Sequence, residues 1–260
     1  MFFDRLDPAD VDPRLRVGHD EAVGWLETLL RRHLTLAGPP SARAACLTGP
    51  PGVGKSIVAR AALQRLAQSF PEALFITVDV GACLGHRGVL EALVSELARA
   101  LDPRRKAGGP APALLAAAQV LRTLTRFEQV PLRVVHEQLR PFQPGLDPAV
   151  TPSFFDALRL AFGLAFDLSD KQIKRLTGVA RFDPVGLAEG LVALVEDLRA
   201  AGLDAVVLLD DLDGLRGVDG RRGPDRRALE ALLALRAAPV GWVITLRTAA
   251  TAVIPREISY

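Results

Sequence analysis

One eight-residue segment, GPPGVGKS, constrains this chain more than any other, and it lies between a predicted strand and a predicted helix. Its glycines let successive backbone N–H groups turn inward to hold an anion, and the following helix directs the positive end of its dipole at the same point. Lys55 supplies a cation for the β- and γ-phosphates, and the Ser56 hydroxyl ligates Mg²⁺. The segment therefore predicts a site for a nucleoside triphosphate. Its residues are Gly49, Pro50, Pro51, Gly52, Val53, Gly54, Lys55 and Ser56.

A second feature is the run AVVLLDDLDGL from Ala205 to Leu215. Its five leading apolar residues predict a central strand, and Asp210 falls at the carboxyl end, where ligands lie in open α/β sheets. A carboxylate there can hold Mg²⁺ through water, so Ser56 and Asp210 are the predicted metal-binding residues. Asp211 occupies the position of an acid that orients and deprotonates an attacking water, with Asp213 as a supporting partner. A solvated acidic turn is the alternative interpretation.

A third feature is the apolar run WVITLRT, which brings Thr245 and Arg247 to the end of another predicted strand. If this strand neighbours the strand of Asp210, one of the two side chains lies near the γ-phosphate. Thr245 is then placed to hydrogen-bond the phosphate or the attacking water, and Arg247 to pair with phosphate charge. Both are candidate catalytic residues together with Asp211. The alternative is that Arg247 only caps the edge of the sheet.

Strand-like and helix-like segments alternate along most of the chain, which predicts an α/β fold: a parallel sheet with helices on both faces. The alternation stops at residues 103–186, which are predicted to be a mainly helical insertion. Residues 1–13 read as an arm, and residues 1–260 as one domain. The predicted strands are Ala44–Leu47, Leu74–Val80, Ala205–Leu209 and Gly241–Leu246. The predicted helices are Glu21–Leu36, Lys55–Ser69, Gly88–Leu101, Ala113–Arg126, Phe154–Phe166, Lys171–Leu176, Leu187–Ala200 and Asp225–Arg236.

The composition narrows the possible classes of protein. Hydrophobic residues make up 49% and charged residues 24% of the chain, as in folded globular proteins. There is no apolar run long enough to cross a bilayer, and the acidic, proline-containing start is unlike a signal peptide, so we expect a cytoplasmic protein with no membrane partner. A formal net charge of +2 gives little support for bulk nucleic-acid affinity. Cys46 and Cys83 are predicted to be buried thiols rather than a disulfide.

These segments, together with RLRVGHDEAV from Arg14 to Val23, resemble the ATPase domains grouped as AAA+ and STAND among the P-loop NTPases. In the origin-recognition and STAND branches, a segment of the form hydrophobic-Gly-Arg-acid-acid helps to seat adenine. The letters VGHDE match that segment here, with His19 in place of the arginine. The resemblance implies that Val17 and His19 contact the nucleotide. The alternative is an ordinary helix start with Asp20 near its cap.

The sensor strand departs from the usual AAA+ pattern, which ends in asparagine. The chain contains no asparagine, so any sensor must be Thr245 or Arg247, and the apolar-Thr-x-Arg pattern is similar to the STAND form. The resemblance covers Arg14–Gly109 and Leu187–Arg256. It implies a P-loop NTPase fold, ATP or ADP with Mg²⁺ as cofactors, and ATP hydrolysis. A helical lid normally follows the sensor strand, but this sequence stops at Tyr260, so the lid is predicted to be absent or to lie beyond it.

Three functions stay open from the sequence. The first is a nucleotide-dependent switch or motor that acts on a protein partner or on copies of itself. The second is a DNA- or protein-binding module with ATP as a structural ligand, suggested by basic residues at 104–106 and 171–175. The third is a small-molecule kinase or a GTPase, although the chain's lysines form no Asn-Lys-x-Asp or Thr-Lys-x-Asp guanine-binding motif.

Overall fold

The computed structural model describes residues 19–35, 43–106, 111–127, 129–139, 179–181, 184–217, 235 and 238–247. Several features predicted from the sequence lie outside these described residues. They are the arm 1–13, Val17, the helices Phe154–Phe166 and Lys171–Leu176, and the helix Asp225–Arg236 apart from Leu235.

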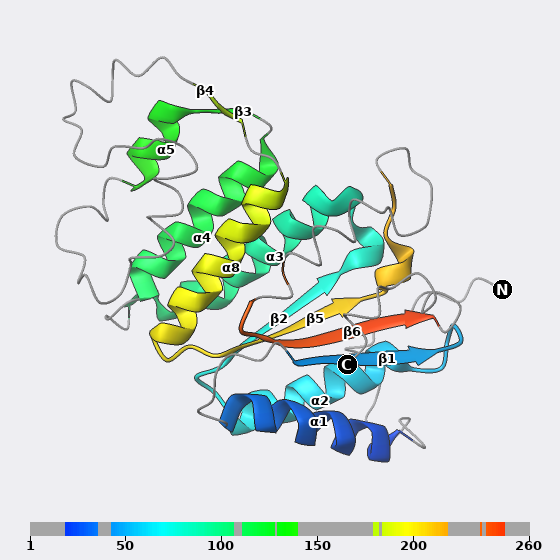
Figure 1. Cartoon of the computed structure of the whole chain (residues 1–260). Helices are drawn as coiled ribbons and strands as arrows, with labels where there is room; N and C mark the ends of the chain where they lie inside the picture. The colour runs from blue at the N-terminus through cyan, green and yellow to red at the C-terminus, as the bar shows by residue number, and fades with distance from the viewer. Residues whose placement is uncertain are drawn as a thin grey trace.

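A four-stranded parallel sheet in the order β1-β6-β5-β2 forms the centre of the fold (Figure 1). Its strands are β1 (Arg43–Gly49), β2 (Leu74–Asp79), β5 (Ala205–Asp210) and β6 (Gly241–Arg247). Each corresponds to a strand predicted from the sequence, so the predicted α/β fold with a parallel sheet is confirmed. Because β6 lies between β1 and β5, the carboxyl end of β6 is flanked by the ends of both neighbours.

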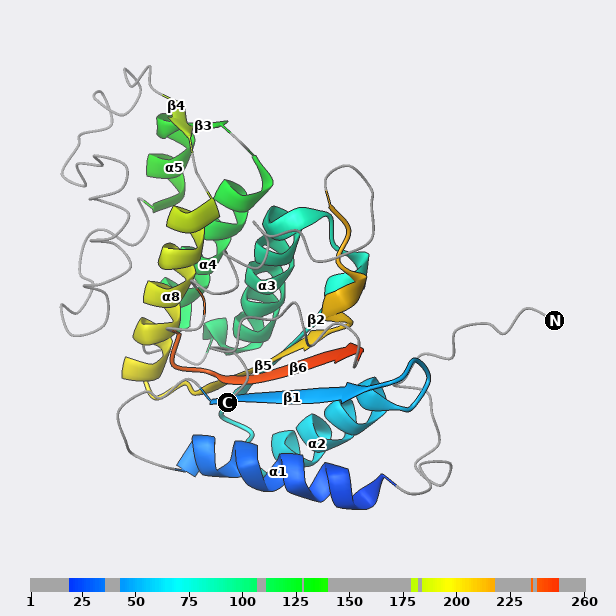
Figure 2. The same ribbon diagram turned by 45° about the vertical axis from the view of Figure 1, so that its right-hand side comes forward.

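Helices cover both faces of the sheet, as predicted (Figure 2). On one face lie α1 (Asp20–Thr35) and α2 (Lys55–Ser69); on the other lie α3 (Gly85–Leu101), α4 (Ala111–Arg126) and α8 (Pro184–Ala200). Shorter pieces are α5 (Leu132–Leu139) and the 3-10 turns η2 (Val80–Ala82), η3 (Asp102–Lys106) and η5 (Leu212–Gly214). No helix within these described ranges has both the length and the apolar character that a transmembrane span requires.

The strand β5 shows why the sheet needs two helical layers. Every residue of β5 is buried. Because successive side chains of a strand point to opposite faces, Val207 and Leu209 enter the core under α3, α4 and α8, whereas Val206 and Leu208 enter the core under α1 and α2. An apolar run of this kind, with its only polar residue at the carboxyl end, is the expected pattern for a parallel strand that is covered on both sides.

Some elements differ from the sequence prediction. The helix α3 begins at Gly85 rather than Gly88, and α8 begins at Pro184 rather than Leu187, where proline suits the first helical position. A small antiparallel pair, β3 (Gln129–Pro131) and β4 (Val179–Arg181), was not predicted. Strands of three residues are too short for alternation to reveal them.

Candidate functional site

The loop between β1 and α2 has the backbone shape that a glycine-rich phosphate loop requires. Gly52 has φ 78° and Gly54 has φ 90°, both in the left-handed region that glycine adopts without steric cost. A Cβ atom at Gly54 would also lie only 2.7 Å from Nε2 of His19. Position 54 therefore requires glycine for two reasons: its backbone conformation is left-handed, and the His19 imidazole packs directly against it.

Lys55 is the first residue of α2, and its ammonium group folds back over the loop. Its Nζ donates hydrogen bonds to the carbonyl oxygens of Gly49 at 3.0 Å and Pro50 at 2.9 Å. These two carbonyls are neutral partners, which a charged phosphate oxygen can replace with a gain in hydrogen-bond strength. The lysine is thus held at the loop in a position from which it can exchange partners.

Asp210, the last residue of β5, is the hub of the site. Only 5% of Asp210 is exposed, and its Oδ1 accepts hydrogen bonds from the hydroxyl groups of Ser56 at 2.7 Å and Thr245 at 2.5 Å. Its Oδ2 faces the guanidinium of Arg60, with 3.5 Å between Nη2 and Oδ2. The structure therefore joins the phosphate loop's helix, β5 and β6 through one carboxylate.

Asp211, the residue after Asp210, has an unusual backbone conformation. Its φ of 56° and ψ of 49° are left-handed, and its backbone N–H donates to Oγ1 of Thr245 at 2.9 Å. Its carboxylate packs against Gly81 and Gly214, so closely that neither position has room for a Cβ atom. A non-glycine residue held in this region carries strain, and such residues cluster at functional sites.

Arg247, at the end of β6, forms an ion pair with Asp213. The Arg247 backbone N–H donates to Oδ1 of Asp213 at 2.9 Å, and its Nε lies 2.9 Å from Oδ2. The Asp213 side chain is 8% exposed and that of Arg247 is 49% exposed. The arginine therefore lies at the mouth of the site, tied to an acid of η5.

Asp210, the side chains that contact it, and the side chains of Lys55, Asp211, Asp213 and Arg247 line one cleft of about 550 Å³, a volume in the range of ligand-binding pockets. Lys55 and Asp210 both belong to its wall, as do Ser56, Thr245 and Arg247. Sequence reasoning missed two charged residues of the lining, Arg60 and Asp79. A signal for each exists: Arg60 follows Ser56 by one helical turn, and Asp79 ends a predicted strand.

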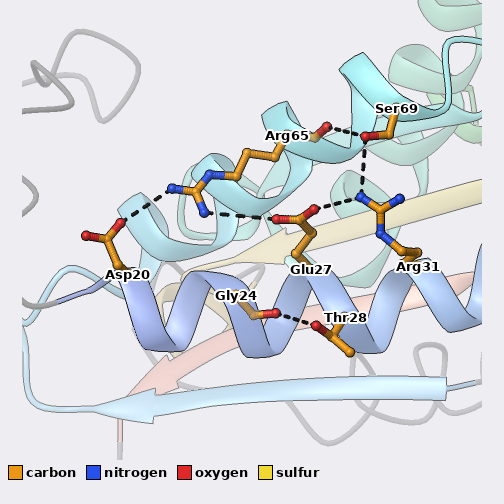
Figure 3. A network of polar contacts seen from close by, with 7 residues as sticks. All are labelled: Asp20, Gly24, Glu27, Thr28, Arg31, Arg65 and Ser69. Atoms are coloured by element: carbon orange, nitrogen blue, oxygen red, sulfur yellow. Dashed lines mark hydrogen bonds and ion pairs between the residues drawn. The ribbon is translucent and has the colours of Figure 1, made fainter.

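His19 immediately precedes α1, and a network of polar contacts fixes that helix against α2 (Figure 3). Arg65 of α2 lies 3.4 Å from Asp20 and 4.0 Å from Glu27. Arg31 in turn contacts Glu27 at 2.8 Å and Ser69 at 3.4 Å. Each exposed pair contributes little alone; the buried Val23, Leu26 and Leu30 pack α1 into a common core with α2, and the network adds to that packing beside His19.

The donor set suits magnesium rather than a protein-only metal cage. In the described part of the chain, no three His, Cys, Asp or Glu side chains are grouped to hold a metal ion. Magnesium is usually bound through one or two carboxylates together with phosphate groups and water. Because Ser56 donates its hydrogen to Asp210, its oxygen lone pairs are available for a cation. The residues present therefore fit a Mg²⁺–nucleotide complex.

The two cysteines contribute no nucleophile to this cleft. Cys83 is buried, as predicted, whereas Cys46 is only partly buried, and both are free thiols. Burial, with the negative charges of Asp79 and Glu91, raises the pKa of Cys83 to about 11. Burial also raises the pKa of Cys46. Both groups are therefore neutral thiols near pH 7, and thiolate chemistry is not expected here.

Replacing Thr245 by valine is expected to destabilise the fold by about 1–3 kcal/mol, since it leaves the Asp211 N–H without its acceptor and removes one donor from Asp210. Thr245 is 1% exposed, so water cannot easily substitute for the hydroxyl. Urea denaturation gives the change in unfolding free energy. Thr28→Val on α1 is the matched control, because that hydroxyl donates to the Gly24 carbonyl of its own helix at an exposed position. Equal effects of the two substitutions would show that the Thr245 bridge contributes nothing.

A comparison with known families shows the family of this chain. A family model described as "AAA ATPase domain" matches residues 17–244. No curated protein matches the chain. The crystal structure of Cdc6p from Pyrobaculum aerophilum is similar over 97% of this chain and 45% of that one, with a TM-score of 0.47 and 18% sequence identity. This chain thus spans less than half of that protein. Because the family model covers most of its length, the chain belongs to the AAA ATPase domain family and is an ATP-binding AAA+ module with a P-loop NTPase fold.

Proposed function

We propose that the chain is a Mg²⁺-dependent ATPase whose nucleotide state acts as a switch or motor for a protein partner or for neighbouring copies of itself. One observation carries the proposal. Ser56 and Thr245, from two different elements, both donate to Asp210 in the same cleft that contains Lys55. This is the convergence of a phosphate loop and an acidic strand end that triphosphate chemistry needs.

In the proposed complex, the loop 49–54 and the start of α2 cradle the phosphates. Lys55 exchanges the carbonyls of Gly49 and Pro50 for phosphate oxygens, and Ser56 and Asp210 hold Mg²⁺. The ion, when bound, neutralises charge on the phosphates. Val17 and His19 contact the adenine end of the nucleotide. The proximity of His19 to Gly54 supports this role, because it puts the imidazole beside the phosphate loop.

Hydrolysis is assigned to Asp211, Thr245 and Arg247. Asp211 orients and deprotonates the attacking water. Thr245 holds Asp210 and Asp211 in place, because its hydroxyl donates to the Asp210 carboxylate and accepts from the Asp211 N–H. Arg247 leaves Asp213 and pairs with the γ-phosphate instead. The ion-pair partner of Arg247 therefore depends on whether the γ-phosphate is bound. The apolar-Thr-x-Arg strand that delivers Thr245 and Arg247 is the feature that favours a STAND-like module.

The nucleic-acid alternative is weakened by one of the residues that suggested it. The guanidinium of Arg104 donates to the carbonyl oxygens of Pro71, Glu72 and Ala73, at 3.0, 2.8 and 3.3 Å. An arginine used in this way anchors η3 to the turn before β2 and has few donors left for a phosphate backbone. DNA affinity that falls steeply with salt would restore this alternative.

The test of the proposal is nucleotide binding and phosphate release by the unmodified chain. ATP is expected to bind in a Mg²⁺-dependent manner, with preference over GTP, and to release phosphate. Absence of ATP binding would overturn the proposal. Size-exclusion chromatography with ATP, with ADP and without nucleotide then separates a motor from a switch: an ATP-dependent increase in size indicates an assembling motor, and a constant size indicates a switch that acts on a partner. A cytoplasmic setting fits this use of ATP.

A further inference from the structure

We infer that Arg60 is a positioning residue of this cleft: its guanidinium is the built-in counter-ion of Asp210 and keeps free divalent cations out until a nucleotide carries one in. The inference deepens the proposed function and rests on it, because it takes Asp210 as the magnesium-binding carboxylate. It concerns a residue that none of the sequence motifs includes.

The geometry of α2 places two donors on the two oxygens of one carboxylate. Ser56 and Arg60 are four residues apart, so they lie on the same face of the helix. Ser56 donates to Oδ1 of Asp210 at 2.7 Å, and Nη2 of Arg60 lies 3.5 Å from Oδ2. A single turn of helix therefore holds the carboxylate from both sides.

The contacts from Ser56 and Arg60 stabilise the negative charge of Asp210. Its side chain is 7% exposed, and a carboxylate so far removed from water is costly unless it is both hydrogen-bonded and paired with a cation. The hydroxyls of Ser56 and Thr245 supply hydrogen bonds but no charge. The Arg60 guanidinium supplies a permanent positive charge, because arginine is not deprotonated in proteins.

Lys55 does not take over this task in the structure. Its ammonium group is directed to the carbonyl oxygens of Gly49 and Pro50. The two cations therefore divide the cleft, with Lys55 over the phosphate loop and Arg60 beside the metal-binding carboxylate. Both line the same cavity, and the Arg60 side chain is still 30% exposed, so it can move as a ligand enters.

A guanidinium in this position disfavours a free divalent cation. Two like charges a few ångströms apart in a partly buried site repel each other strongly, since the effective dielectric constant is well below that of water. A bound triphosphate reverses this effect, because its negative charge is larger than the positive charge of one guanidinium and attracts the cation. Metal binding thereby becomes dependent on nucleotide binding.

The test uses Mn²⁺ as the probe and the full nucleotide-free chain, with free and bound Mn²⁺ separated by electron paramagnetic resonance. Arg60→Gln is expected to bind Mn²⁺ roughly tenfold or more tightly than the unmodified chain, because the competing charge is gone. Arg60→Lys keeps the charge and is expected to bind as weakly as the unmodified chain. In the double variant Arg60→Gln with Asp210→Asn, the gain is expected to vanish. Arg65→Gln, on the same helix but directed at α1, is the matched control and is expected to show no gain.

A purely structural role for Arg60 would not produce a gain of metal binding, which makes this readout decisive. Unchanged or weaker Mn²⁺ binding by a folded Arg60→Gln variant would overturn the inference. Tight Mn²⁺ binding by the unmodified chain without nucleotide would overturn it as well, and that measurement does not depend on any variant folding. Circular dichroism checks the fold of each variant.

The two proposals fail in different ways. If the unmodified chain binds no ATP but Arg60→Gln gains Mn²⁺ through Asp210, the proposed function is overturned and the counter-ion is supported. If ATP binds with Mg²⁺ and Arg60→Gln gains no Mn²⁺, the proposed function is supported and the counter-ion is overturned.

Discussion

Replacing Lys55 by alanine is expected to abolish ATP binding at ordinary nucleotide concentrations while leaving the chain folded. The ammonium makes two hydrogen bonds to the loop carbonyls of Gly49 and Pro50 in the structure. In the proposed complex these are exchanged for charged phosphate oxygens. The substitution removes that attraction, and no other lysine lies among the described residues of the cleft wall.

The expected magnitude follows from the number of charged hydrogen bonds. Each hydrogen bond to a charged partner contributes about 1.5–3 kcal/mol. Two such bonds correspond to a roughly 10²–10⁴-fold loss of ATP affinity. Isothermal titration calorimetry with ATP and Mg²⁺ measures this loss directly, and thermal unfolding without nucleotide shows whether the loop itself has been damaged.

Arg99→Ala is the matched control for Lys55→Ala. It also removes one positive charge from a helix, but the Arg99 side chain is 78% exposed and, among the residues that the structure describes, pairs with Glu96 of its own helix. Its ATP affinity is expected to equal that of the unmodified chain. An Lys55→Ala variant that still binds ATP tightly would contradict the assignment of this loop to the phosphates.

The backbone part of the site was predictable because local rules determine it. A glycine string between a strand and a helix fixes the phosphate loop, and an apolar run that ends in Asp210 fixes a strand tip. The further expectation that the Thr245 strand would neighbour that of Asp210 is confirmed by the pairing of β5 with β6. Parallel strands bring their carboxyl ends to one edge, so three separate segments were expected to meet there.

The choice of side-chain partners could not be predicted in the same way. Four acids, Asp79, Asp210, Asp211 and Asp213, lie along the same cleft, and sequence spacing does not say which one an arginine selects. Arg247 pairs with Asp213 because β6 ends beside η5. This places Arg247 at the mouth of the cleft, where sequence reasoning had left open both a phosphate contact and a simple cap of the sheet edge.

Arg60 shows the same limit more sharply. Helical periodicity puts Arg60 on the same face of α2 as Ser56 and Arg65 on the opposite face, where it contacts Asp20 and Glu27. The spacing does not say which acid the Ser56 face meets, and that depends on the placement of α2 beside the end of β5. A tertiary contact therefore decides that Arg60 pairs with Asp210.

Replacing Asp211 by asparagine is expected to lower the rate of ATP hydrolysis by about 10²–10⁴-fold, the usual contribution of a general base, while ATP affinity is retained. The substitution keeps the shape of the side chain and removes its charge. Asparagine also tolerates the left-handed backbone conformation seen at this position, so the turn is expected to persist. Phosphate release under saturating ATP, with calorimetry for affinity, separates the two effects.

Asp204→Asn is the matched control, because Asp204 directly precedes β5 and so lies at the opposite end of the strand that ends in Asp210. The same chemical change there is expected to leave hydrolysis unchanged.

If Asp211→Asn hydrolyses ATP at the normal rate, Asp211 is not the base. Its carboxylate, packed against Gly81 and Gly214, would then serve to join η2 to η5. The base would have to be another acid of the cleft, and Asp79 is the first to test, because it pairs in register with Asp210 at the end of β2. The outcome thus decides whether the strained turn after β5 exists for chemistry or for architecture.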